Sequence, residues 1–143
     1  MYAEFELPYG HGTLIARVPE RNVSFVLQPR HEAGLQNESA AITTALRGPM
    51  GRPPLVECIK PQDRVVVIAT DNTRACPDDR LLPPILSELE TVVPREQITV
   101  LVALGLHPPL DGAGLRLLLG SYVVDNYRVL NHDPDSVVNI GTT

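Results

Sequence analysis

Two short runs of apolar, largely β-branched residues dominate the middle of the chain. Val65–Ala69 and Ile98–Leu104 have the length and composition of strands that are buried on both faces. The stretch between them repeats apolar residues at helical spacing, at Leu82, Ile85, Leu86 and Leu89. A strand, a helix and a second strand in this order form a βαβ unit, in which the two strands are parallel. We therefore expect an α/β fold with a parallel, Rossmann-like sheet at its core.

Two prolines, Pro83 and Pro84, fall inside this helical repeat. Proline lacks a backbone N–H and clashes with the preceding turn, so it is unfavourable in a helix interior. The first turn tolerates it, because the N–H groups there have no partner in the helix. We therefore expect both prolines to lie in the first turn of the helix.

The N-terminal part of the chain has the alternation typical of strands. Phe5 and Leu7 alternate with polar residues, "PYGHG" supplies turn residues, and alternation resumes at Leu14, Ala16 and Val18. This pattern predicts an N-terminal β-hairpin. A further short strand is predicted at Ser24–Leu27.

Capping residues mark two more helices. One is expected to begin after Asn37 and to end at Gly48, and the other to begin after Asp111 and to end at Gly120. Two further strands are expected in "YRVLNHD", residues 127–133, and in "SVVNI", residues 136–140. Because no element follows to close the sheet, we expect a free edge that a homo-oligomer could cover.

Composition limits the class of protein. The chain has 143 residues and 43% apolar content, which suits one globular domain spanning residues 1–143. Its net charge of -5, without a Lys/Arg run, argues against a nucleic-acid partner. No apolar run reaches the ~20 residues of a membrane span, so we expect a cytoplasmic protein. Cys58 and Cys76 lack CxxC spacing and are interpreted as free thiols.

Polar residues follow both central strands. The first strand runs into "TDNTR", which contains Asp71, Thr73 and Arg74, and the second into "ALGLH", which ends at His107. Parallel strands end at the same edge of a sheet, where open α/β sheets bind ligands. The strands are about 4.8 Å apart if they are neighbours and about 10 Å if one strand intervenes. Either spacing allows Asp71, Arg74 and His107 to border one small pocket.

These three residue types suggest distinct roles. His107 is suited to accept a proton near neutral pH, Arg74 to bind an anion with its planar fork, and Asp71 to orient its neighbours. Each also has an ordinary structural explanation. Asp71 can cap the following turn, Arg74 can pair with Asp78 or Asp79 at the surface, and His107 can be a loop histidine.

Other site types fit less well. A dinucleotide-binding module needs a glycine-rich turn after its first strand, and "ATDNTRAC" contains no glycine. A cysteine hydrolase could use Cys76 with His107, but Cys76 precedes a proline and no oxyanion loop is evident. No metal site is predicted, since paired ligand spacing is absent among His11, His31, His107 and His132. A non-catalytic α/β ligand-binding or interaction domain remains the alternative.

Several short motifs resemble one known family in the same order along the chain. "DNTRACP" resembles the D-x-T-R-x-x-P signature of the nickel-dependent lactate racemase family, and "ALGLH" is similar to its A-x-G-x-H segment. The same family pattern is matched by "LPYG", "ALRGPMGRPPL", "LLG", "NHD" and "NIGTT". The resemblance is to the N-terminal part of that family and covers essentially the whole chain.

The resemblance implies an isomerase: a racemase or epimerase of 2-hydroxy acids, such as lactate or a related acid. The family uses a nickel pincer nucleotide cofactor and works by proton-coupled hydride transfer. His107 matches one of two opposed acid/base histidines, and Asp71 matches a polar residue beside the site. Arg74 matches the residue that holds the substrate carboxylate, and Thr73 of the same motif is expected to bind the substrate with it.

The match also implies that the chain is one part of a larger protein. The family's second histidine, its cofactor-carrying lysine and its nickel-binding histidine match no residue here, and Lys60 precedes the motif strand. We therefore expect this chain to be the N-terminal fragment of a larger two-domain racemase-like protein. Without the C-terminal part, the fragment is expected to be inactive and to bind no cofactor. The cofactor-binding residues are not identified. Pro108 and Pro109 stand where many members carry arginine after the histidine, so the substrate acid is left open.

Overall fold

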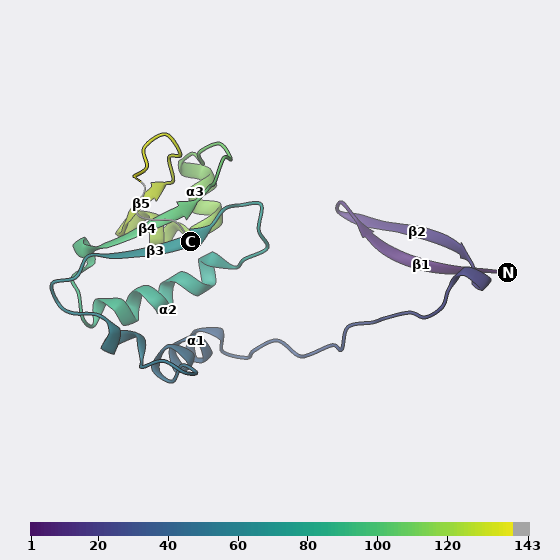
Figure 1. Cartoon of the computed structure of the whole chain (residues 1–143), viewed down its shortest axis with the longest axis horizontal. Coiled ribbons are helices and arrows are strands. Elements are labelled where there is room, and N and C mark those ends of the chain that lie inside the picture. The colour runs from purple at the N-terminus through teal and green to yellow at the C-terminus, as the bar shows by residue number, and fades with distance from the viewer. Residues whose placement is uncertain (139–143) are drawn as a thin grey trace. The chain divides into compact units, whose positions relative to one another are not determined.

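The computed structural model describes residues 1–138, which divide into two compact units (Figure 1). The first unit, residues 1–34, contains a β-hairpin. The second, from residue 35 onward, contains the parallel sheet and the α-helices. Among the described residues, no helix has the length and hydropathy needed to cross a membrane. The prediction that residues 1–143 form one domain stays a prediction.

The first unit confirms the predicted hairpin. β1 (Tyr2–Tyr9) and β2 (Gly12–Pro19) pair antiparallel, and the turn between them places Gly10 at a φ of 58°. Glycine adopts this left-handed conformation without steric cost. The predicted strand at Ser24–Leu27 is wrong, since these residues lie in an exposed segment without regular structure. A four-residue segment such as SFVL forms no strand unless another strand receives its backbone hydrogen bonds.

The second unit confirms the parallel α/β fold. Its sheet has the order β3-β4-β5, and both strand pairs are parallel. The strands are β3 (Val65–Thr70), β4 (Ile98–Ala103) and β5 (Arg128–Asn131). The connecting helices are α2 (Asp78–Glu90), then α3 (Gly112–Leu119) and α4 (Ser121–Asn126). β3 and β4 are therefore direct neighbours, the closer of the two spacings that the sequence allowed.

Capping interactions set the predicted helix ends. α1 (Glu38–Arg47) begins after Asn37, whose side chain accepts a hydrogen bond of 3.0 Å from the backbone N–H of Ala40. α3 begins after Asp111, which accepts a 2.7 Å hydrogen bond from the N–H of Gly114. Both helices end at the predicted glycines, and such side-chain caps satisfy N–H groups that the helix leaves free.

The start of α2 corrects the sequence prediction. α2 begins at Asp78, so Pro83 and Pro84 lie inside the helix rather than in its first turn. The two prolines cannot donate to the carbonyl groups of Asp79 and Arg80, which belong to exposed residues and can bind water. Pro84 is itself buried, so its contacts with the core offset the lost hydrogen bonds.

The helices cover one face of the sheet. Ile98, Val100 and Val102 of β4 are fully buried, and they pack in one cluster with Leu86 of α2 and Leu119 of α3. Figure 1 shows α2 lying along β3. α1 is fastened to α2 by hydrogen bonds from Arg47 to Glu88, at 2.7 and 3.1 Å, and from Arg80 to Glu38. The opposite face of the sheet carries exposed apolar side chains, including Val66 at 56% and Ile68 at 67% exposure. The prediction that Val65–Ala69 is buried on both faces is therefore wrong for the described residues, because α2, α3 and α4 all pack on one face.

The C-terminal predictions are met in part. The strand expected in residues 127–133 is β5. Of the strand expected in residues 136–140, residues 136–138 form no strand, and the remainder lies outside the described residues.

Leu86 provides a test of this core. Replacing Leu86, which is fully buried, by alanine is expected to lower the free energy of unfolding by about 2 to 5 kcal/mol, because the cavity loses packing contacts. Leu117→Ala, at an exposed position of α3, should change it by less than about 0.5 kcal/mol. Urea unfolding followed by circular dichroism measures both. Equal effects would contradict the core assignment.

Candidate active site

The carboxyl ends of β3 and β4 border a hollow of about 240 Å³. Asp71 and Arg74 lie on the loop after β3, and His107 on the loop after β4. The remaining lining residues are Thr70, Ala103, Leu104, Gly105 and Leu106. The structure thus brings Asp71, Arg74 and His107 to one place, because parallel pairing puts both loops at the same edge. Their chemical roles stay predictions.

Asp71 and His107 form the central contact of the site. The Oδ2 atom of Asp71 contacts Nδ1 of His107. Its Oδ1 atom accepts hydrogen bonds from Thr73, at 2.8 Å from the hydroxyl and 3.3 Å from the backbone N–H. Asp71 is only 4% exposed, so these bonds replace water around a buried carboxylate. The contact with His107 first, and those with Thr73 second, hold the pKa of Asp71 below its usual range.

The contact determines which nitrogen of His107 is free. A carboxylate accepts hydrogen bonds, so Asp71 favours the tautomer in which Nδ1 carries the proton. Nε2 is then left with a lone pair, and the His107 side chain is 52% exposed. A buried carboxylate behind an exposed imidazole is the arrangement of a general base, since the carboxylate stabilises the ring once it is protonated.

Arg74 is held close to this pair. Its backbone N–H donates to the carbonyl oxygen of Asp71 at 3.2 Å, and its side chain also lines a second hollow beside α3. Among residues 1–138, no ion pair involves Arg74. Asp78 instead accepts hydrogen bonds from Thr70 and Cys76. The described structure therefore lacks the surface pair that the sequence allowed, and Arg74 is available to an anion.

Unlike Asp71 and Arg74, Thr73 points its hydroxyl group at another motif residue and not at the hollow. Its hydroxyl donates to Asp71, and it does not line the hollow. The structure gives it a contact that orients the carboxylate, and its predicted substrate-binding role stays a prediction.

Asn131, at the end of β5, was not predicted to support the site. The Asn131 side chain donates to the carbonyl oxygen of Leu110 at 2.8 Å and accepts from its N–H at 3.3 Å. These bonds fasten the loop that carries His107, Pro108 and Pro109 to the sheet. The "NHD" motif was visible, but the pairing partner of its asparagine depends on a loop conformation that the sequence does not specify.

His132 follows Asn131 and lines another hollow together with His107. This hollow measures about 480 Å³ and continues over Asp133 and Asp135. The backbone N–H of His132 donates to Val102, whereas its Nδ1 atom is buried without a hydrogen-bond partner among the described residues. The space around His107 therefore extends from the end of β3 to the end of β5.

The two cysteines are free thiols, as predicted. Burial, followed by the neighbouring carboxylate of Asp78, raises the pKa of Cys76. A raised pKa keeps the sulfur protonated, whereas a nucleophilic cysteine needs a thiolate. The arrangement does not support a cysteine hydrolase.

The described residues do not assemble a metal centre. Among residues 1–138, no three His, Cys, Asp or Glu side chains lie where they could together hold a metal ion. Lys60 lies in the segment before β3, and its backbone N–H donates to Asp63. It is therefore on the side of the sheet where the strands begin, away from His107, and is not placed to carry a cofactor at the site.

Comparison with known proteins gives the family. Residues 9–143 match the family described as the lactate racemase N-terminal domain. The chain belongs to this family. The resemblance seen in the motifs is thereby confirmed over nearly the whole sequence.

Relatives of the racemase family match along the same range. The chain is 30% identical over 141 residues to the lactate racemase of Lactiplantibacillus plantarum, covering 95% of this chain and 33% of the relative. It is 26% identical over 142 residues to the lactate racemase of Thermoanaerobacterium thermosaccharolyticum, covering 96% and 33%. The solved apoprotein structure of a lactate racemase from Thermoanaerobacterium thermosaccharolyticum matches with a TM-score of 0.74 and 25% identity, covering 92% of this chain and 30% of that one. The chain thus spans about a third of the length of these racemases.

The Asp71 contact predicts a pH dependence of stability. Because the folded pKa of Asp71 lies below its ordinary value of about 3.8, its ionised form stabilises the fold above that value. This contribution is lost as the pH falls from 3.8 through the lowered folded pKa. The gap in unfolding free energy between the wild type and Asp71→Asn should therefore shrink between about pH 5 and pH 2. His107→Asn removes the main cause of the lowered pKa of Asp71. In that background, the difference in unfolding free energy between Asp71 and Asp71→Asn should depend less on pH. The same pH dependence with and without His107 would show that His107 does not act on Asp71.

Proposed function

We propose that this chain provides the substrate-anchoring and proton-transfer part of a racemase or epimerase of 2-hydroxy acids. The observation that supports the proposal is the Asp71–His107 contact beside Arg74 in one hollow. Family membership, and the names of the matched relatives, favour a 2-hydroxy acid such as lactate as substrate.

Each side chain has a separate task in this proposal. Arg74 binds the substrate carboxylate through two parallel charge-assisted hydrogen bonds. Nε2 of His107 accepts the proton of the substrate hydroxyl group, and Asp71 stabilises the imidazolium that results. A hollow of about 240 Å³ is smaller than the pockets that hold drug-sized ligands. Its size suits a small acid.

The family resemblance implies a nickel pincer cofactor for the complete enzyme. The described residues of this chain offer no metal-ligand group and no lysine at the site. We therefore assign proton transfer and carboxylate binding to this chain, and no step through the cofactor. The residues that carry the cofactor belong, in this proposal, to the C-terminal part of the same protein.

The choice of acid depends on the loop after His107. Pro108 and Pro109 restrict the backbone there, and Asn131 fixes the next turn of the loop through Leu110. Lactate or a related 2-hydroxy acid is proposed, and testing several acids distinguishes between them.

Arg74→Lys tests the carboxylate contact. A lysine keeps the charge but loses the planar fork, so kcat/KM of the complete enzyme should fall by the equivalent of about 1.5 to 3 kcal/mol. Arg52→Lys, at an exposed position before β3, is the control and should leave kcat/KM unchanged. Interconversion of the two enantiomers, followed by chiral separation, is the measurement. Equal kinetics for Arg74→Lys and the wild type would show that Arg74 does not bind the substrate.

His107→Ala tests the proton acceptor. In the complete enzyme it should suppress racemisation by about 10²- to 10⁴-fold, the usual contribution of a general base. His31→Ala, an exposed histidine outside the site, should not. Residues 1–143 alone should neither racemise 2-hydroxy acids nor bind nickel stoichiometrically. Turnover by the isolated chain, or full activity after His107→Ala, would contradict the proposal.

A further inference from the structure

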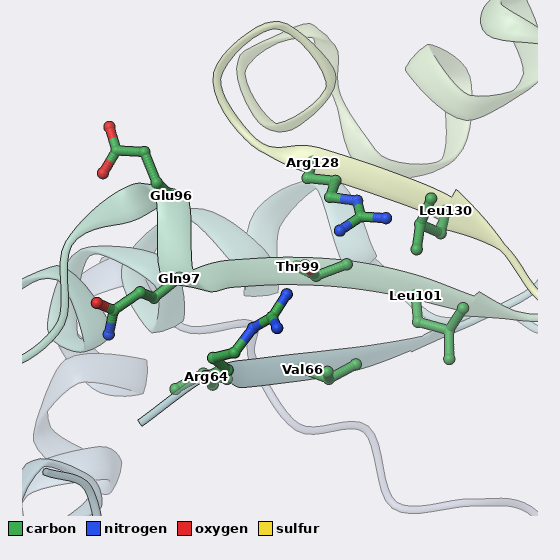
Figure 2. Close-up of a pocket in the computed structure, with 9 residues that line it drawn as sticks. Arg64, Val66, Glu96, Gln97, Thr99, Leu101, Arg128 and Leu130 are labelled. Carbon is green, nitrogen blue, oxygen red and sulfur yellow. The ribbon is translucent and has the colours of Figure 1, made fainter. Parts of the chain in front are cut away.

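The face of the sheet that the helices leave bare is built as a regular apolar surface. The strand register places Val66, Thr99 and Arg128 in one row across the sheet, and Ile68, Leu101 and Leu130 in the next. Val66 is 56% exposed and Ile68 67% exposed. Figure 2 shows most of these side chains standing on the same face. Val66 and Ile68 belong to β3, an edge strand of the described sheet, and with Leu101 and Leu130 they form a contiguous apolar surface, which is typical of an interaction site.

The topology explains why this face is bare. Crossovers between parallel strands are right-handed, so strands added in one direction receive their helices on one face. The order β3-β4-β5 is of this kind, and the cluster around Val100 and Val102 marks the covered face. Parallel sheets are ordinarily covered on both faces by helices. The cover for the second face must therefore come from an element other than α2, α3 and α4.

Two arginines mark one end of the bare face. Arg64 precedes β3 and Arg128 begins β5, and together they border a hollow of about 280 Å³ at the amino ends of the strands. In Figure 2 their guanidinium groups point toward each other over Thr99, while the carboxylate of Glu96 points away. The ion pairs found among residues 1–138 include neither arginine. Both arginines are exposed, so an anionic group placed between them would be attracted by two positive charges.

On the covered face, an arginine at the amino edge of the sheet binds the C-terminal ends of two helices. Arg95, just before β4, contacts the carboxylate of Glu90 and donates to the side chain of Asn126 at 3.1 Å. Glu90 and Asn126 are the last residues of α2 and α4. Crossover helices run antiparallel to the strands, so their C-terminal ends, which carry partial negative charge, arrive at the amino edge of the sheet. Arg64 and Arg128 occupy the matching place on the bare face.

We propose that the bare face of β3-β4-β5 docks an amphipathic helix that runs antiparallel to the strands. Its apolar stripe covers Val66, Ile68 and Leu101, and its C-terminal end presents carboxylates and free carbonyl groups to Arg64 and Arg128. The chain spans 33% of the L. plantarum racemase. We propose that the helix belongs to a segment equivalent to the part of that relative which this chain does not span. The inference rests on the family and on the shape of the sheet, and not on the chemistry assigned to His107.

A thiol-protection experiment tests the docking. In a Cys58→Ser, Cys76→Ser background, Ile68→Cys is made in residues 1–143 and in a fusion of these residues to the unmatched remainder of the L. plantarum lactate racemase. Maleimide labelling of Ile68→Cys is expected to be at least tenfold slower in the fusion. Leu117→Cys, 87% exposed on α3, is the control and should label equally fast in both. Equal labelling of Ile68→Cys in a fusion that is folded by circular dichroism would overturn the proposal.

Charge reversal tests the orientation of the helix. Arg64→Glu with Arg128→Glu in the same fusion should restore labelling of Ile68→Cys to within about threefold of the rate in residues 1–143, because like charges then meet. Arg52→Glu, outside the face, should leave the protection intact. Full protection after the double reversal would overturn the assignment of the acidic helix end. His107→Ala in the fusion should not alter protection, which separates this result from a failure of the proposed function.

The isolated chain gives a test that does not depend on the fusion. If the face is uncovered in residues 1–143, Ile68→Asp should shift the Tm by less than about 3 °C, as exposed substitutions do. Val100→Asp, on the covered face, should unfold the protein. A second copy of the chain is the competing occupant. A wild-type dimer in sedimentation that Ile68→Asp dissociates, or a large loss of Tm in that variant, would show that the face is already covered and would overturn the proposal.

Discussion

The parallel pairing of β3 with β4 is the constraint on which the rest of the structure depends. Because Val65 pairs with Ile98 and Thr70 with Ala103, the two strands end in register at one edge. The loops that follow therefore start a strand spacing apart, about 4.8 Å. This is what lets a carboxylate from one loop meet an imidazole from the other across 36 residues of sequence.

Much of this arrangement could be predicted from the sequence, for reasons that particular residues show. The apolar runs around Val67 and Val100 indicated two strands, although burial on both faces was not met for Val66 and Ile68. The caps Asn37 and Asp111 satisfy helix N–H groups through local contacts. Such signals act over a few residues, so they can be read without the fold. The strand expected at Ser24–Leu27 failed because a strand depends on a distant partner. The start of α2 was misplaced because burial of Pro84 outweighed a local rule.

For the candidate site, the sequence predicted which residues gather but not which of their atoms are in contact. That Asp71, Arg74 and His107 lie at one edge followed from the βαβ order. Which atoms meet did not, since the Asp71–His107 contact and the two hydrogen bonds of Asn131 depend on loop conformations. Thr73 illustrates the limit: its place in the motif suggested a substrate ligand but gave no sign that its hydroxyl group donates to Asp71. The motif identifies which residues gather, and the loop backbone decides what each one touches.

The order of the strands also bears on how the protein is made. In β3-β4-β5 each strand pairs with the next one along the chain, but each pairing is parallel and spans a helical crossover, as in Val65 with Ile98 and Thr99 with Arg128. Such non-local pairings form slowly and leave apolar surface exposed while the chain is synthesised. Ile68, which is 67% exposed, and its neighbours then form an exposed apolar surface on the nascent chain until the proposed helix covers them. The apolar rows to which we propose that a helix binds are therefore also the part of the nascent chain most open to aggregation.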